Sequence, residues 1–180
     1  MTPSPQAPLP QAGEGSRNDR AGKPRGRQTL RRWLKSTSNR TFIVYPLLVF
    51  ALELALQGAM PVVVPWALPL LAWGYLQYRL VGRYRLRLGR GGPGVDVPPE
   101  KIVEHGPYRY VRNPMYLGHL IFMLGLALAF QSWPAAALFA FHCVWFNRRV
   151  VADEAGLEKL FGVPYLDYKA RVKRWIPGVF

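Results

Sequence analysis

Residues 42–60 read FIVYPLLVFALELALQGAM, a stretch in which Glu53 is the only charged residue. A run of this length is typical of a helix that crosses a membrane, because about 20 apolar residues span a hydrocarbon layer of about 30 Å. Three further apolar stretches follow along the chain, at residues 62–81, 115–130 and 134–147. The sequence therefore predicts an all-α integral membrane protein with about four transmembrane helices.

The positive charges are placed so that they predict the topology. The chain has 24 Lys and Arg against 10 Asp and Glu, and every Lys and Arg falls within residues 17–40, 79–112 or 148–174. The turns at residues 58–61 and 131–134 contain none. Since Lys and Arg accumulate on the cytoplasmic side, this distribution predicts a multi-pass protein with both termini in the cytoplasm. It also favours contact with anionic lipid headgroups over nucleic acid, although the net charge is +14.

The two ends of the chain differ from its middle. Residues 1–40 form a basic arm, predicted to be disordered, because its first part is rich in Pro, Gly, Ser and Arg and poor in bulky apolar residues. The arm lacks the apolar core of a signal peptide. Residues 41–180 form the membrane domain. Within it, residues 148–180 are predicted to be a cytoplasmic helical region, with one helix ending at Gly162 and another beginning near Pro164.

Metal chemistry has no support in the sequence. Cys143 is the only cysteine, and it lies in an apolar run, so packing is its simplest role. The chain has three histidines, without the His and Cys spacing of a zinc site, and it has no phosphate-loop motif. We therefore expect no metal ion.

Residues 104–118, EHGPYRYVRNPMYLG, lie at the cytoplasmic mouth of the third apolar stretch. Asn113 is a good N-cap residue, and Pro114 suits the first position of a helix. A helix N-terminus beside Arg112 attracts a carboxylate or a phosphate. From composition alone, a positively charged interfacial anchor explains this stretch equally well.

A second stretch, residues 148–158, carries Arg149, Asp153, Glu154 and Glu158. Taken by itself, this pattern is typical of a solvated helix whose charges pair at a spacing of four residues.

Together the two stretches resemble the isoprenylcysteine carboxyl methyltransferases and phospholipid N-methyltransferases. The first stretch is similar to that family's Gly-x-Tyr-x-x-x-Arg-His/Asn-Pro-x-Tyr-x-Gly signature at Gly106, Tyr108, Arg112, Asn113, Pro114, Tyr116 and Gly118. The second is similar to the family's C-terminal pattern at Arg149, Asp153, Glu154, Leu157, Phe161, Gly162, Tyr165, Tyr168, Val172, Arg174 and Pro177. The resemblance covers residues 101–177, about the C-terminal half of the chain.

The resemblance implies an integral membrane enzyme that transfers a methyl group from S-adenosylmethionine to a lipophilic or membrane-delivered acceptor. The acceptor would be a lipid amine, a carboxylate or another small apolar molecule. The resemblance places the following residues at the cofactor: His105, Gly106, Tyr108, Arg112, Asn113, Tyr116 and Glu154. Arg149 and Glu154 become the catalytic candidates, Arg149 as a positioning group.

The residue types suit this cofactor. Arg112 can bind its carboxylate with two hydrogen bonds, and Glu154 can accept its ammonium group. Tyr108 or Tyr116 can lie against the adenine or the cationic sulfonium. Isoprenylcysteine enzymes usually have His at the position of Asn113, and Asn cannot titrate near neutral pH.

Three polar residues interrupt the apolar stretches. Glu53 is costly inside a membrane unless it is paired or protonated, so it is a candidate base for the methyl acceptor. His119 is a second candidate at the acceptor pocket, and His142 lies in the fourth stretch. The alternative is structural, a buried hydrogen bond from Glu53 to a histidine of another helix.

Two other functions stay open on the sequence. A membrane reductase of the sterol reductase type would use the basic loop to bind the phosphates of a nicotinamide cofactor. A non-enzymatic basic membrane scaffold would use residues 1–28 to recruit acidic partners or lipid.

Overall fold

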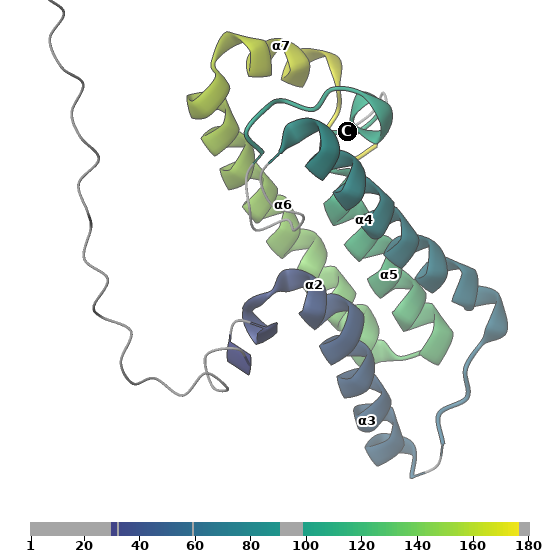
Figure 1. Ribbon diagram of the computed structural model, residues 1–180. Helices are drawn as coiled ribbons and strands as arrows, with labels where there is room; N and C mark the ends of the chain where they lie inside the picture. The colour runs from purple at the N-terminus through teal and green to yellow at the C-terminus, as the bar shows by residue number, and fades with distance from the viewer. Residues whose placement is uncertain (1–29, 32, 59, 91–98, 177–180) are drawn as a thin grey trace, which may run out of the picture.

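A computed structural model describes residues 30–31, 33–58, 60–90 and 99–176, and these residues form a helical protein without β-strands (Figure 1). The elements are α2 (Thr37–Asn39), the π-helix η1 (Arg40–Val44), α3 (Tyr45–Gln57), the 3₁₀ turn η2 (Pro65–Ala67), α4 (Leu68–Gly89), the 3₁₀ turn η3 (Gly106–Arg109), α5 (Pro114–Phe130), α6 (Trp133–Phe161) and α7 (Val163–Arg171).

Helix α5 is the centre of the bundle. It packs along α4 on one side and along α6 on the other, while η1 contacts it and α3 continues beside the lower part of the bundle in Figure 1. Helix α7 follows directly after α6 and crosses the opposite end of the bundle. Buried side chains of α5 and α6, among them Met123, Phe146 and Val150, form the main core.

The turn between α5 and α6 follows from two local signals. Gln131 adopts the left-handed conformation that ends α5, at φ 48°. Ser132 then caps α6, and its Oγ accepts a hydrogen bond from the N–H of Ala135 at 3.2 Å. Pro134 occupies the first turn of α6, where its missing N–H costs nothing.

Helices α4 and α5 approach closely because glycines line their contact. A Cβ atom at Gly74 would lie 2.5 Å from the backbone nitrogen of Phe122 and 2.8 Å from the carbonyl oxygen of Gly118. A Cβ atom at Gly118 would lie 2.9 Å from the carbonyl oxygen of Gly74. Only glycine permits this backbone contact, so these two residues set the distance between the helices.

We expect Gly74→Ala to lower the free energy of unfolding by about 1–3 kcal/mol, because the added methyl group meets backbone that cannot rotate away. Gly156→Ala in α6 is the matched control, since a Cβ atom there meets nothing within 4 Å. It should stabilise the protein by up to about 1 kcal/mol through helix propensity. Thermal unfolding in detergent measures both, and equal melting temperatures for the two variants would contradict the close-contact account.

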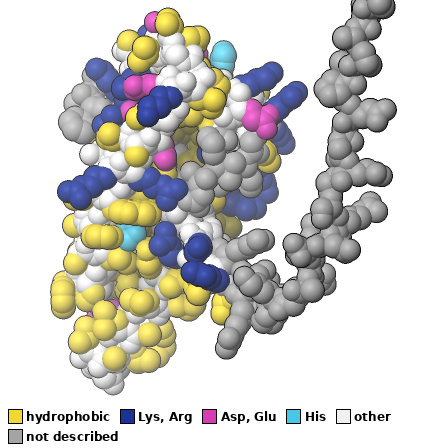
Figure 2. All heavy atoms as spheres, turned by 90° about the vertical axis from the view of Figure 1, so that its left-hand side faces the viewer, with side chains coloured by type: hydrophobic (Ala, Val, Ile, Leu, Met, Phe, Trp, Pro, Cys, Tyr) yellow, Lys and Arg dark blue, Asp and Glu magenta, His cyan; other side chains and the backbone are white. Residues whose placement is uncertain are grey.

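One described helical segment, Thr37–Gln57, is long and apolar enough to cross a membrane by length and composition. Helix α5 is apolar but has only 17 residues, while α4 carries arginines in its second half and α6 carries charges after Asn147. Large apolar side chains nevertheless face outward, for example Leu47 (64% exposed) and Phe141 (61%). Figure 2 shows hydrophobic side chains covering the lower part of one face, below a group of Lys and Arg. Four spans remain a prediction.

The second predicted stretch differs most from the structure. Residues 60–64 are not helical, and the N–H of Val64 bonds instead to the carbonyl oxygen of Ala129 at 2.8 Å. Helix α4 begins only after Pro65 and continues to Gly89. The helix therefore continues past residue 81, the predicted end of this stretch, because leucine and arginine are good helix formers and keep the helix intact.

The predicted disordered arm lies mostly outside the described residues. Within its described part, helical structure already covers residues 30–31, 33–35 and 37–40. The fourth predicted span and the first helix of the C-terminal region are one continuous helix, α6, which ends where Gly162 adopts φ 62°.

Candidate functional site

A cavity of about 470 Å³ lies at the α7 end of the bundle, between the segment before α5, the start of α5, the second half of α6 and α7. This volume is within the range of about 300–1,000 Å³ that is typical of small-molecule sites. Much of its wall is apolar, with Ile102, Val103, Met115, Leu157, Leu160 and Phe161. The non-tyrosine polar side chains in the wall are Arg85, Arg112, Asn113, Arg149 and Asp153.

Four tyrosines also line the cavity: Tyr108, Tyr116, Tyr165 and Tyr168. The hydroxyl of Tyr168 donates to the carbonyl oxygen of Tyr108 at 2.8 Å, which ties α7 to η3. Burial raises the pKa of Tyr108 and of Tyr168, so both phenols stay neutral over the physiological range. The cavity therefore offers uncharged aromatic surface.

Asp153, Tyr116 and Arg149 form the polar part of the cavity wall. The hydroxyl of Tyr116 donates to Oδ2 of Asp153 at 2.8 Å, and Nε of Arg149 lies 3.9 Å from the same oxygen. The side chain of Asp153 is 44% exposed and that of Arg149 is 27% exposed. Both charged groups are therefore accessible to a ligand, and neither belongs to a fully buried ion pair.

A second, mostly buried cluster lies around Glu154, one residue further along α6. Nε of Arg112 donates to Oε1 of Glu154 at 3.0 Å, and Nη2 of Arg174 donates to Oε2 at 2.9 Å. Nδ2 of Asn113 adds a third donor to Oε1 at 3.0 Å. The side chains of Glu154 and Arg112 are only 3% and 8% exposed.

The remaining N–H groups of Arg112 bind the C-terminal segment. Nη1 donates to the carbonyl oxygens of Lys169 and Val172 at 2.8 and 2.6 Å. The backbone joins at the same place, because the N–H of Arg112 donates to the carbonyl oxygen of Lys173 at 2.9 Å. We call Arg112, Asn113, Glu154 and Arg174 the clasp, since they join the segment before α5, helix α6 and the end of the chain.

The charges of the clasp control the ionisation of Glu154. Burial alone would raise the pKa of this carboxyl, but hydrogen bonds from Arg174, Arg112 and Asn113 outweigh it and hold the pKa below its ordinary value. Glu154 is therefore a carboxylate wherever the protein is folded near neutral pH.

Comparisons with known proteins match a region that contains both sequence stretches, residues 104–118 and 148–158. A family model described as phospholipid methyltransferase matches residues 90–163. Protein-S-isoprenylcysteine O-methyltransferase A of Arabidopsis thaliana is 38% identical over 80 residues, 43% of this chain and 40% of the relative. The protein-S-isoprenylcysteine O-methyltransferase of Schizosaccharomyces pombe is 35% identical over 78 residues, 42% of this chain and 33% of the relative. The chain is similar to the isoprenylcysteine methyltransferases and the phospholipid methyltransferases. The matches span less than half the length of these curated relatives.

The named relatives are O-methyltransferases. The cavity of this chain brings together five of the residues predicted for the site: Tyr108, Arg112, Asn113, Tyr116 and Arg149. Four others do not reach the cavity wall: Glu53, His105, Gly106 and Glu154.

Glu154, which the sequence predicts to accept the ammonium group of the cofactor, is engaged by other groups in this structure. Its two oxygens already accept hydrogen bonds from Arg112, Asn113 and Arg174, and it is 2% exposed. Arg112 borders the cavity, but most of its donors are used within the clasp, which leaves it little capacity to bind the carboxylate of the cofactor. Nor is Asn113 a side-chain N-cap of α5, since its amide points to Glu154 instead.

His105 and Gly106 are both exposed and lie between the wall residues Val103 and Tyr108. Gly106 has a structural reason to be glycine. It adopts φ +59°, and a Cβ atom would lie 2.6 Å from the ring of Tyr84. The tight turn allows η3 to bring Tyr108 into the wall.

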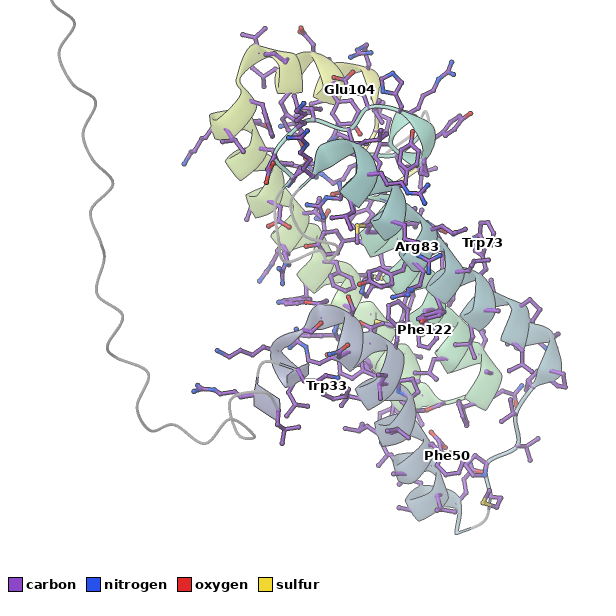
Figure 3. All side chains as sticks on the ribbon, viewed as in Figure 1. Trp33, Phe50, Trp73, Arg83, Glu104 and Phe122 are labelled. Atoms are coloured by element: carbon purple, nitrogen blue, oxygen red, sulfur yellow. The ribbon has the colours of Figure 1, made fainter. Side chains whose placement is uncertain are left out.

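Glu53 is far from this site, near the turn between α5 and α6 at the other end of the bundle. Its Oε1 accepts a hydrogen bond from Ser132 at 2.5 Å, and its Oε2 accepts one from Gln57 at 2.8 Å. The structure thus favours a structural role for Glu53, with Ser132 rather than a histidine as partner. His142 lies instead 3.2 Å from the hydroxyl of Tyr45, and His119 is buried among aromatic rings. Figure 3 places Phe50 and Glu104, which mark these two regions, at opposite ends.

Sequence reasoning missed Asp153 and Arg85 as cavity residues. Asp153 follows Arg149 by four residues, so both lie on one face of α6, whereas Glu154 is turned about 100° away. This spacing was visible in the sequence, but choosing between two adjacent carboxylates required knowing which face of α6 meets the cavity.

Proposed function

We propose that the protein transfers a methyl group from S-adenosylmethionine to a lipophilic acceptor, in the cavity beneath α7. The observation that carries the proposal is the cavity itself: apolar and aromatic walls, with Arg149 and Asp153 side by side, built from the two stretches that the methyltransferase relatives resemble.

The cavity suits this cofactor. The volume of the cavity is adequate for a small-molecule cofactor, and uncharged tyrosines such as Tyr108 offer an aromatic face to the adenine or the sulfonium. Asp153, partly exposed, would attract the ammonium or sulfonium charge. When bound, the cofactor supplies an electrophilic methyl group whose departure leaves a neutral thioether.

The protein's own contribution is mainly alignment, since methyl transfer requires the acceptor atom in line with the breaking bond. Arg149 is placed to hold an anionic acceptor, and the hydroxyl of Tyr116 fixes the carboxylate of Asp153 against rotation. The buried apolar wall residues, including Val103 and Met115, would exclude water from the reacting groups.

We propose a carboxylate as the acceptor, as the names of the isoprenylcysteine O-methyltransferase relatives suggest. A carboxylate carries its own lone pair at neutral pH and needs no general base, whereas a protonated amine does. Asn113, which cannot titrate and is engaged by Glu154, is compatible with this chemistry.

We further propose that four helices embed the protein in a membrane, with both termini in the cytoplasm. The outward apolar side chains of α3 and the first parts of α4 and α6 support this, as does the absence of Lys and Arg from the two short turns. The arginine-bearing half of α4 and the end of α6 would then project to the cavity side.

Calorimetric titration of the detergent-purified protein with S-adenosylmethionine tests the proposal. We expect binding in the micromolar range, and we expect Leu157→Trp to weaken it at least about tenfold by filling the cavity. Leu166→Trp, on the exposed side of α7, is the control and should bind normally. A folded wild-type sample that binds a reduced nicotinamide cofactor but not S-adenosylmethionine would contradict the proposal and favour a reductase.

A further inference from the structure

One face of α6 changes from apolar to cationic along the helix. Phe141, Trp145 and Arg149 follow one another at four-residue spacing, so they lie above one another on the helix. Phe141 is 61% exposed, and Trp145 is half-buried. Apolar, then aromatic, then cationic is the order found on a helix face that passes from the hydrocarbon layer of a membrane to its headgroups.

A second guanidinium meets the same ring from a different helix. The guanidinium carbon of Arg40 lies 5.7 Å from the centre of the Trp145 ring, and that of Arg149 lies 5.6 Å from it. Two positive charges therefore lie against one aromatic ring, and the described residues give Arg40 no carboxylate partner.

Arg40 also has an unused donor in a buried place. Its Nε is buried and has no hydrogen-bond partner among the described residues. It belongs to η1, a π-helical turn, and such turns are frequently found at functional sites. A buried N–H without a partner costs free energy, so an acceptor supplied by a ligand would stabilise this arrangement.

We propose that Arg40 binds the phosphate of an anionic phospholipid beside Trp145, the ring that Arg149 of the cavity wall also contacts. A guanidinium binds phosphate oxygens with two parallel hydrogen bonds, and the positive charge of Arg149 adds to the attraction for the oxyanion. Trp145 keeps both side chains in position through cation–π contacts.

The surroundings favour a lipid over free inorganic phosphate. Phe141 lies one turn from Trp145 on the side away from Arg149, and Ile43, 43% exposed, follows Arg40 on η1. Acyl chains attached to the phosphate would cover these apolar side chains. Arg40 lies near the N-terminal end of Thr37–Gln57, the one described helical segment that is apolar enough to span a membrane, and the headgroups would lie at that depth. Figure 2 shows the same change from apolar to cationic, with a group of Lys and Arg above a hydrophobic surface.

Asp153 is an acidic neighbour of this site, with its Oδ2 3.9 Å from Nε of Arg149. The same oxygen accepts a hydrogen bond from the hydroxyl of Tyr116 at 2.8 Å. Arg40 is not part of the cavity wall. Binding at Arg40 can therefore be tested apart from methyl transfer.

The test is native mass spectrometry of the full chain in detergent, titrated with phosphatidylglycerol or phosphatidylcholine. We expect phosphatidylglycerol to bind more tightly, and Arg40→Gln to weaken its first binding step about tenfold, the size of a charge-assisted contact. Arg83→Gln removes an equal charge from an exposed position of α4 and should change the affinity less than about twofold. Arg40→Lys should fall between wild type and Arg40→Gln, because it keeps the charge but loses the fork.

Equal losses in Arg40→Gln and Arg83→Gln would overturn the site, because they would show general charge attraction. Phosphatidylcholine binding as tightly as phosphatidylglycerol would overturn it too. Displacement of the lipid by an equal concentration of inorganic phosphate would overturn the lipid assignment and make the free ion the ligand. Melting temperatures show whether each variant is folded, and a poorly folded Arg40→Gln leaves the Arg40→Lys comparison to decide.

Discussion

Replacing Glu154 by alanine is expected to lower the free energy of unfolding by about 3–5 kcal/mol. The reason is that the change leaves Arg112, with its side chain 8% exposed, buried without its counter-charge. Arg112 is also the residue that binds the carbonyl oxygens of Lys169 and Val172, so the end of the chain should detach from the bundle first. Thermal or denaturant unfolding in detergent measures the loss.

Glu158→Ala is the matched control, one turn further along α6. Its partner is Lys169, and the two side chains are 30% and 36% exposed. Exposed ion pairs contribute little, so this variant should lose less than about 1 kcal/mol. Similar losses in both variants would show that the buried clasp has no special weight.

The clasp also predicts how stability depends on pH. Since the folded pKa of Glu154 is below its ordinary value, its contribution is complete above the unfolded pKa of about 4.3 and disappears as the pH falls through the folded pKa. Wild type should therefore lose melting temperature more steeply than Glu154→Gln as the pH falls below about 4.3. Parallel acid profiles of the two proteins would contradict this origin of the acid sensitivity.

The adjacent carboxylate should behave in the opposite way. We expect Asp153→Asn to reduce methyl transfer about 10- to 100-fold, the loss of one charge-assisted contact, while the melting temperature changes little. Asp153 is 44% exposed and faces the cavity, so removing its charge leaves no fully buried partner without a counter-charge. Initial rates at saturating S-adenosylmethionine, together with its KM, measure the effect.

Asp167→Asn provides the control for Asp153→Asn. Asp167 is an exposed residue of α7 outside the cavity wall, so the same loss of charge should leave the rate unchanged. An Asp153→Asn variant with wild-type rate and KM would remove this residue from the site. A variant that is inactive because it is unfolded would show that Asp153 stabilises the fold instead.

The parts of the fold that were predictable have helix start and stop signals in the local sequence. Residues 115–130 were predicted as a helix and form α5, Pro114–Phe130, because Pro114 starts it and the turn at Gln131 ends it. Gly162 and Pro164 similarly mark the boundary between α6 and α7. These signals act within a few residues, so a sequence displays them directly.

The parts that were not predictable depend on contacts between distant residues. The start of α4 was misplaced because Val64 bonds to Ala129, a partner 65 positions away along the chain. The choice between Asp153 and Glu154 as a cavity residue was not predictable for a similar reason. Both are carboxylates in the same motif, and only the positions of Arg112 and Arg174 reveal which one is enclosed.

The central claim is that the cavity beneath α7 transfers methyl groups to a lipophilic acceptor. The most direct measurement uses S-adenosylmethionine with a radioactive methyl group, a prenylated cysteine as acceptor, and the protein in lipid bilayers. The account predicts radioactivity in the organic extract as a base-labile methyl ester, which Leu157→Trp abolishes and Leu166→Trp does not. A folded wild-type protein that binds both molecules and forms no methylated product, with this or any membrane lipid extract, would contradict it.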